Sequence, residues 1–358
     1  MSYVTTNTYI SIINKKTCMQ REPLVSILTC IYNQAPYVEQ TIQSVLKQSY
    51  KNWEWIILDD GSTDNTGDII RKHRNGRIRY AFQEHGGVRH ISKTFNKALH
   101  MCRGDLIATL DGDDYWPENK LEIQVRNFHD PDAVLSYGES WLVNDKGKRI
   151  CYINLPGDKS IACNDPVGSA LKDLLLKRSC FIVNSTVMYR KSALLTIGGF
   201  VEVDCLFQDY PTWIRLSLEG KFSPIPFLLG YYRKHSQSSL TLRNPEEVFE
   251  HDIAFFKVFL SQYREELADL GFSYDRNKIE DNWEKIRTYL PYNTALYMLM
   301  IGSFAESQAA FERFLKKMPS LKHKLIYCLI KLSSLIRFDL VNPMSFLKWR
   351  IRKFLIGT

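Results

Sequence analysis

The chain has 358 residues, of which 45% are hydrophobic and 24% are charged, a balance that is ordinary for a folded protein. Its eight cysteines form no CxxC pair, which argues against a disulfide framework or a zinc site and indicates reduced thiols in a cytoplasmic protein. Residues 1–21 lack the apolar core of a signal peptide, and no apolar run reaches the roughly 18 residues of a membrane span.

Most of the net charge of +8 lies at the C-terminal end. Residues 321–358 contain eight Lys or Arg and one acid, so this segment contributes +7. The rest of the chain is close to neutral and shows no basic groove, which weighs against a nucleic-acid partner. Apolar and aromatic residues alternate with these charges, a pattern that suits a helix lying on an anionic membrane surface. The alternative is a tail that packs on its own domain or on a partner chain, and a homodimer is one such assembly.

Strands and helices alternate through the first 115 residues. Strands are predicted over 24–30, 53–58, 78–82 and 106–110, and helices over 36–48, 65–73 and 91–102. This alternation predicts a parallel α/β sheet, in which ligands bind beyond the carboxyl ends of the strands. Three of these ends carry polar groups, at Tyr32-Asn33, Asp59-Asp60 and Asp111-Asp113-Asp114, so we expect them to converge on one edge.

Beyond residue 117 the pattern becomes α+β. Helices are predicted over 119–128, 171–176, 191–197 and 209–219, and strands over 133–137, 141–144, 185–189, 222–229 and 231–232. The stretch 154–165 is rich in turn residues and predicts a loop. From residue 245 only helices are predicted, and 287–319 resembles a single helix-turn-helix repeat. One copy favours an ordinary helical hairpin packed on the preceding domain over a repeat array.

An apolar strand ends at three carboxylates grouped around Gly112. Crowded carboxylates raise one another's pKa unless a cation lies among them. Hard oxygen ligands suit Mg²⁺ or Mn²⁺, which usually also hold phosphate oxygens. Taken alone, this stretch fits a divalent-metal site for a phosphorylated substrate and an acidic helix-capping turn about equally well.

Four motifs together resemble the family 2 glycosyltransferases, which have the GT-A fold. They are Val25-Ser26-Ile27 with Tyr32-Asn33, Asp59-Asp60-Gly61-Ser62-Thr63-Asp64, Leu110-Asp111-Gly112-Asp113-Asp114, and Gly198-Gly199-Phe200 with Gln208-Asp209. The likeness covers about residues 23–239. It implies an α/β protein with the GT-A nucleotide-diphospho-sugar transferase fold, a Rossmann-like mixed sheet flanked by helices, followed here by a C-terminal all-helical extension.

The resemblance also implies a division into regions. We expect a polar N-terminal extension (1–22), a GT-A domain (23–240) and a helical C-terminal region (241–358) with a basic amphipathic tail. Within the GT-A domain, 23–118 would bind the nucleotide sugar, and 119–240 would supply the acceptor site and the catalytic base.

The family's activity implies roles for individual residues. It transfers a sugar, here foremost from a UDP-sugar, to an acceptor hydroxyl with inversion and with a divalent metal, Mn²⁺ or Mg²⁺. Asp209 matches the general base, with Asp204 as a competitor, although the usual Glu-Asp pair is Gln208-Asp209 here. The metal ligands would be Asp113, Asp111 and His235. The nucleotide-sugar contacts would be Tyr32, Asn33, Asp59, Asp60, Asn96, Asp111, Gly112 and Arg233. Trp116 and Gln208 are candidates for the acceptor site.

Two other function classes compete with this prediction. A nucleotidyltransferase should carry a Gly-rich, basic phosphate loop after the first strand, but 31–36 contains no Gly, Lys or Arg. A non-catalytic scaffold would keep the fold without the chemistry, and intact Asp111, Asp113 and Asp209 argue against it. The expected partners are a nucleotide-diphosphate sugar, a saccharide or lipid-linked saccharide of a surface polysaccharide, and an anionic membrane surface. The expected location is the cytoplasm, peripherally on the inner face of the cell membrane.

Overall fold

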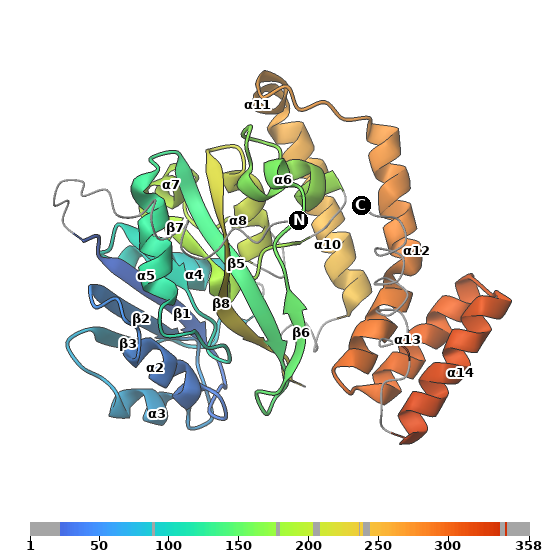
Figure 1. The fold of residues 1–358 in the computed structure, drawn as a ribbon, viewed down its shortest axis with the longest axis horizontal. Helices are drawn as coiled ribbons and strands as arrows, with labels where there is room; N and C mark the ends of the chain where they lie inside the picture. Colours follow the sequence, from blue (N-terminus) through green and yellow to red (C-terminus); the bar gives the residue numbers. More distant parts are fainter. Residues whose placement is uncertain are drawn as a thin grey trace, which may run out of the picture.

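The computed structural model describes residues 22–87, 90–176, 180–202, 208–235, 237–238, 244–336 and 341 (Figure 1). The strands are β1 (Val25–Ile31), β2 (Trp53–Asp59), β3 (Ile78–Phe82), β4 (Leu106–Thr109), β5 (Ala133–Val143), β6 (Arg149–Ile153), β7 (Met188–Arg190) and β8 (Lys221–Arg233). The helices and helical turns among them are α2 (Val38–Leu46), α3 (Thr66–Lys72), α4 (Ile91–Met101), α5 (Lys120–Val125), η2 (Arg126–His129), α6 (Lys159–Cys163), η3 (Lys172–Leu176), η4 (Asn184–Thr186), α7 (Lys191–Thr196) and α8 (Asp209–Leu216). The C-terminal helices are α10 (Pro245–Gln262), α11 (Arg264–Asp269), α12 (Arg276–Met300), α13 (Phe304–Lys317) and α14 (Leu321–Ile336).

The strands form one mixed eight-stranded sheet in the order β3-β2-β1-β4-β7-β5-β6, with β8 paired to β5. The first four are parallel, as predicted, so the carboxyl ends of β1, β2 and β4 lie on one edge. Strand β7 runs antiparallel to β4, so its beginning, and not its end, lies at that edge. The sheet therefore gathers the predicted polar ends together with the turn that precedes β7.

Successive side chains of a strand point to opposite faces of the sheet. Both faces carry apolar side chains here, and helices cover both. On β2, Trp55 and Ile57 pack with α2, whose Val38, Ile42 and Val45 recur at helical spacing. On the opposite face, Ile56 and Leu58 belong to a larger core with α4, α8 and α10.

The C-terminal helices do not form an independent unit. Phe256 of α10 and Trp283 of α12 belong to the same core as the sheet, so the predicted boundary near residue 240 does not separate two cores. The end of α12 packs with α13 and α14 in a second cluster around Phe311, Phe314 and Ile330. As expected, α12 and α13 form a helical hairpin, which projects from one side of the molecule (Figure 1). None of the described helices is long and apolar enough to cross a membrane.

The second half of the sheet differs from the prediction. The two strands expected around Gly138 are one strand, β5, and the strands expected over 222–229 and 231–232 are one strand, β8. A Cβ on Gly138 would lie 2.5 Å from Leu229 Cδ1, so the glycine permits β8 to approach and does not break β5. The predicted loop 154–165 contains α6, and β6 was not predicted.

Candidate functional site

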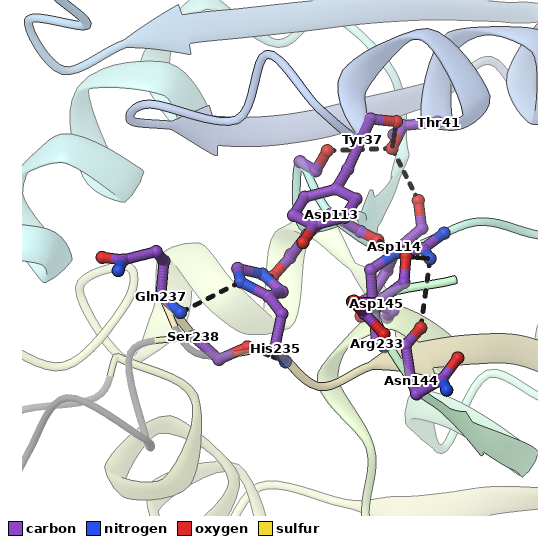
Figure 2. Close-up of polar contacts among 12 residues, drawn as sticks. Tyr37, Thr41, Asp113, Asp114, Asn144, Asp145, Arg233, His235, Gln237 and Ser238 are labelled. Atoms are coloured by element: carbon purple, nitrogen blue, oxygen red, sulfur yellow. Dashed lines mark hydrogen bonds and ion pairs between the residues drawn. The ribbon is translucent and has the colours of Figure 1, made fainter. Parts of the chain in front are cut away.

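Asp113 and His235 meet at the sheet edge beyond β4, as Figure 2 shows. His235 Nε2 lies 2.9 Å from Asp113 Oδ2, and their side chains are only 3% and 16% exposed. Gln237 N donates to His235 Nδ1 at 3.2 Å, so in the neutral ring the proton lies on Nε2, which donates to Asp113. Metal binding through Nε2 would require this proton to move to Nδ1 and the Gln237 contact to be lost.

Asp111 is held by an amide that the sequence analysis missed. Asn184 Nδ2, in η4, lies 3.1 Å from each carboxylate oxygen of Asp111. Burial, followed by the charges of Asp113 and Asp209, raises the pKa of Asp111 to about 7, and the Asn184 hydrogen bond opposes this shift. The three carboxylates are therefore close enough to interact, and a cation among them would relieve their repulsion.

Asp114 has a different environment from its two neighbours. It is buried, its Oδ1 accepts a hydrogen bond from Arg233 N at 2.7 Å, and its Oδ2 accepts one from Ser185 Oγ. Burial raises its pKa well above the usual range, and the charges of Asp113 and Asp111 add to the shift. Asp114 therefore fixes the loop. Packing requires a glycine at position 112, because a Cβ on Gly112 would lie 2.6 Å from the Ile31 side chain.

Arg233 does not lie where the predicted phosphate contact requires. The residue is 2% exposed, and its guanidinium donates to the carbonyl oxygens of Asp113 (2.8 Å) and Asp145 (2.9 Å). The same group lies 4.9 Å from the centre of the Tyr37 ring. This guanidinium ties the loop after β4 to the turn after β5 (Figure 2), so we correct its role from phosphate binding to positioning.

The predicted nucleoside end lies at the ends of β1 and β2. Asp59 is held by its own turn and by β3, since Oδ1 accepts from Ser62 N (2.8 Å) and Oδ2 from Tyr80 Oη (2.7 Å). Asp60 reaches the next segment instead, with His85 Nδ1 2.9 Å from Oδ2. Both carboxylates of the pair therefore reach beyond their own turn, Asp59 to β3 and Asp60 to the segment after β3.

Two further predicted nucleoside residues line the same end. Asn33 has a φ of 50° and accepts a hydrogen bond from Thr63 N at 2.8 Å, so its amide joins the ends of β1 and β2. Tyr32 is 41% exposed, and its ring stacks on the His85 ring with 4.1 Å between centroids. An exposed, positioned aromatic face of this kind suits stacking on a nucleobase.

Two other predicted contacts are structural in this fold. Asn96 donates to Phe200 O and accepts from Phe200 N, and thereby holds α4 to the segment that leads to α8. Trp116 is 3% exposed and donates through Nε1 to Ser185 O, with the Lys120 amine 3.9 Å from its ring centre. We therefore correct Asn96 from a donor contact and Trp116 from an acceptor contact to residues that hold the fold.

Asp209 is the first residue of α8, and Gln208 before it is the N-cap. No side-chain cap bond is made by Gln208, and Asp209 Oδ1 accepts from Tyr210 N at 2.7 Å. Trp213 of α8 donates to Tyr189 Oη of β7 at 2.8 Å, which places this helix start beside β7. Asp204, the competing base, lies outside the described residues.

Lys234 is a second residue that the sequence analysis missed. It is 4% exposed, and its amine lies 4.4 Å from the Tyr232 ring centre and 5.9 Å from that of Tyr297 in α12. Burial lowers its pKa to about 8, and the charges of Asp113, Asp114, Asp111 and Asp209 oppose the shift. A cation therefore lies among the carboxylates, and the C-terminal helices reach this part of the site.

The carboxylate oxygens at this edge fit a hard divalent cation whose remaining coordination positions stay open for other ligands. Within the described ranges, no three His, Cys, Asp or Glu side chains gather into a metal-binding group. Mg²⁺ sites often use one or two carboxylates and complete the shell with water and substrate phosphates. Asp111 and Asp113 meet that requirement.

A cavity of about 700 Å³ lies at the opposite edge of the sheet, lined by residues such as Pro23, Tyr50 and Asp105. This edge holds the beginnings of β1 and β4. Ligands of parallel sheets bind beyond the carboxyl ends, so we assign no function to this cavity.

Comparisons with known proteins identify the family of this chain. The sequence profile of Glycosyl transferase family 2 matches residues 26–197. Putative teichuronic acid biosynthesis glycosyltransferase TuaG of Bacillus subtilis is 33% identical over 204 residues, which cover 56% of this chain and 74% of TuaG. The UDP-Glc:alpha-D-GlcNAc-diphosphoundecaprenol beta-1,3-glucosyltransferase WfaP of Escherichia coli is 32% identical over 216 residues, covering 60% of this chain and 79% of WfaP.

Solved structures show the fold. S. aureus TarS in complex with UDP-GlcNAc aligns with a TM-score of 0.52 at 17% identity, covering 88% of this chain and 89% of TarS. Mannosyltransferase PcManGT from Pyrobaculum calidifontis, in complex with GDP-Man and Mn²⁺, aligns with a TM-score of 0.50 at 14% identity. The alignment covers 92% of this chain and 89% of PcManGT. The predicted GT-A fold is confirmed.

Proposed function

Because the chain belongs to glycosyltransferase family 2, we propose that it transfers a sugar, with inversion, from a nucleoside diphosphate sugar to a hydroxyl of a lipid-linked saccharide. The observation that carries this proposal is the order of groups along one sheet edge. Tyr32 and Asp60 lie at the ends of β1 and β2, Asp111 and Asp113 beyond β4, and Asp209 beside β7. This order matches that of a donor, with base first, diphosphate next and sugar last.

Asp209 acts as the general base in this proposal. Its carboxylate takes the proton of the acceptor hydroxyl while that oxygen forms a bond to the anomeric carbon. The bond from this carbon to the diphosphate breaks on the opposite face, and the electron pair leaves with the nucleoside diphosphate. The position at a helix start favours the ionised carboxylate that this role needs.

Asp113 and Asp111 would hold a Mn²⁺ or Mg²⁺ ion, with His235 positioned to orient Asp113. When bound, such an ion neutralises charge on the departing diphosphate. Lys234 adds a positive charge on the same side at pH values below its pKa of about 8. Support for a metal comes from the donor set and from PcManGT, whose structure contains Mn²⁺.

UDP as the donor nucleotide and a polyprenyl-diphosphate-linked acceptor are supported by the name of WfaP. The test is a panel of nucleotide sugars incubated with Mn²⁺ or Mg²⁺ and a polyprenyl-diphosphate-linked saccharide, with release of nucleotide as the readout. NMR of the product should show an inverted anomeric centre. No release from any donor by folded protein would contradict the proposal.

Metal affinity is expected to depend on pH through Asp111, whose pKa is about 7 because of burial and the Asp113 charge. A proton competes with the metal below this value, so Mn²⁺ affinity should rise about tenfold per pH unit up to about pH 7 and then level off. Calorimetric titration across this range measures it, and a flat profile would contradict the assignment of Asp111.

The same shift predicts how stability changes with pH. The folded-state pKa of Asp111 exceeds its usual value, so ionisation destabilises the metal-free fold as pH rises from about 4 to about 7. Mn²⁺ should therefore raise the midpoint of thermal unfolding more at about pH 8 than at about pH 5.5. Matched melts with and without Mn²⁺ give this comparison.

We also propose that the protein binds peripherally to an anionic membrane through helix α14. Its exposed apolar side chains, spaced three or four residues apart, form one stripe: Leu321, Leu325, Cys328, Leu332 and Leu335. The opposite face packs inward through the fully buried Ile330. The helix contains Lys322, Lys324 and Lys331 and no Asp or Glu. Such a surface binds through apolar burial and attraction to anionic lipid.

Substituting Leu325→Ser with Leu332→Ser is expected to weaken binding to phosphatidylglycerol-containing vesicles by about tenfold or more, because each leucine contributes about 1.5 kcal/mol when buried. Vesicle co-sedimentation measures the effect. Leu195→Ser, on α7 and 53% exposed, is the matched control and should bind as wild type. If the double variant bound vesicles as well as wild type, a role for the stripe in membrane binding would be contradicted. If the double variant became monomeric in mass photometry, the stripe would be assigned to self-association.

A further inference from the structure

A turn at the sheet edge has a polar atom with no partner. In η4, Asn184 is 9% exposed, and its Nδ2 is directed to Asp111 at 3.1 Å. Its Oδ1 is buried and accepts no hydrogen bond in the described part of the chain. A buried acceptor without a donor is costly, and native proteins rarely keep one without a use.

The surrounding contacts hold this amide in place. The Asn184 carbonyl oxygen accepts from Thr109 Oγ1 at 3.0 Å, and Thr109 is the last residue of β4. The next residue, Ser185, donates to Asp114 and accepts from Trp116 Nε1. The turn is thus fixed directly against the acidic loop, so the free oxygen has a defined position beside Asp111.

The order of strands places this oxygen where a donor sugar would lie. Strand β4 carries Asp111 and Asp113 at its end, β7 is its neighbour, and Asn184 lies just before β7 on the same edge. Helix α8, which begins with Asp209, contacts β7 through Trp213 and Tyr189. Asn184 therefore lies one strand beyond the proposed diphosphate site, on the side of the proposed base.

We propose that Asn184 recognises the transferred sugar, with Nδ2 orienting Asp111 and Oδ1 accepting a hydrogen bond from one sugar hydroxyl. This inference rests on the proposed function and adds a specificity-determining residue to it. A sugar that lacks this hydroxyl, or presents it with the opposite configuration, leaves the acceptor unpaired and binds less well.

The test compares Asn184→Ala with wild type in calorimetric titrations with UDP plus Mn²⁺ and with UDP-glucose, UDP-galactose and UDP-N-acetylglucosamine plus Mn²⁺. Because the variant also removes the Nδ2 bond to Asp111, UDP with Mn²⁺ should lose some affinity, and the best-bound UDP-sugar should lose about tenfold more than UDP does. Asn127→Ala is the matched control, since Asn127 Nδ2 donates to Ile123 O far from this edge.

Donors that lack one hydroxyl test the inference on the unsubstituted chain. One of them should bind wild type about tenfold more weakly than the parent, and Asn184→Ala should weaken its binding no more than it weakens that of UDP. Equal losses for UDP and UDP-sugar, or no loss for either, would overturn the sugar contact and leave the proposed function standing. A folded wild type that binds no nucleotide would overturn the proposed function itself.

Discussion

An Asp209→Asn variant is expected to bind its donor normally and to transfer sugar about 10³-fold more slowly, because only the proton acceptor is lost. The substitution preserves size, and Oδ1 can still accept from Tyr210 N, so α8 should be retained. The loss should appear in kcat, while the affinity for nucleotide with Mn²⁺ stays within about twofold. Coupled release of nucleoside diphosphate gives the rate, and calorimetry gives the binding.

The competing explanation is that Asp209 only stabilises the start of a helix. Asp275 offers a matched control, since it caps α12 through bonds to Asn277 N and Lys278 N away from the sheet edge. Asp275→Asn should lower the unfolding midpoint slightly and leave kcat unchanged. If Asp209→Asn behaved like Asp275→Asn, with full turnover and a small loss of stability, the general-base role would be wrong.

The alternation of strands and helices in the first half was predictable because each element carries its own local pattern. Trp53 to Leu58 is apolar except for Glu54, as expected of a strand covered on both faces, and α2 repeats its apolar residues at helical spacing. The long strand β5 was not predictable in the same way. Gly138 reads locally as a break, and only the approach of Leu229, 91 residues away, explains it.

The convergence of the acidic groups was also predictable, since parallel strands bring their ends to one edge. Which side chains face a ligand was not. Arg233 and Asn96 have the chemistry of substrate contacts, yet each meets backbone groups more than 100 residues away. Asn184 was missed because β7 is antiparallel, so its beginning lies at the edge where the ends of its neighbours were sought. A polar Asn-Ser-Thr turn before that strand was the available signal.

The last prediction separates Asp113 from the rest of the acidic loop. Asp113→Asn is expected to lower metal-dependent transfer by about 10³-fold, because it removes a charge that would hold the ion against the diphosphate. The neighbouring Asp114→Asn should retain Mn²⁺ affinity within about threefold, since that carboxyl is buried, its pKa is raised, and its oxygens accept from Arg233 N and Ser185 Oγ. Its effect should instead be a lower unfolding midpoint. Calorimetry with Mn²⁺ and UDP, together with thermal melts, gives both quantities for each variant. Equal loss of Mn²⁺ affinity in the two variants would mean that the cluster binds the ion collectively, and retained affinity in Asp113→Asn would remove it from the metal site.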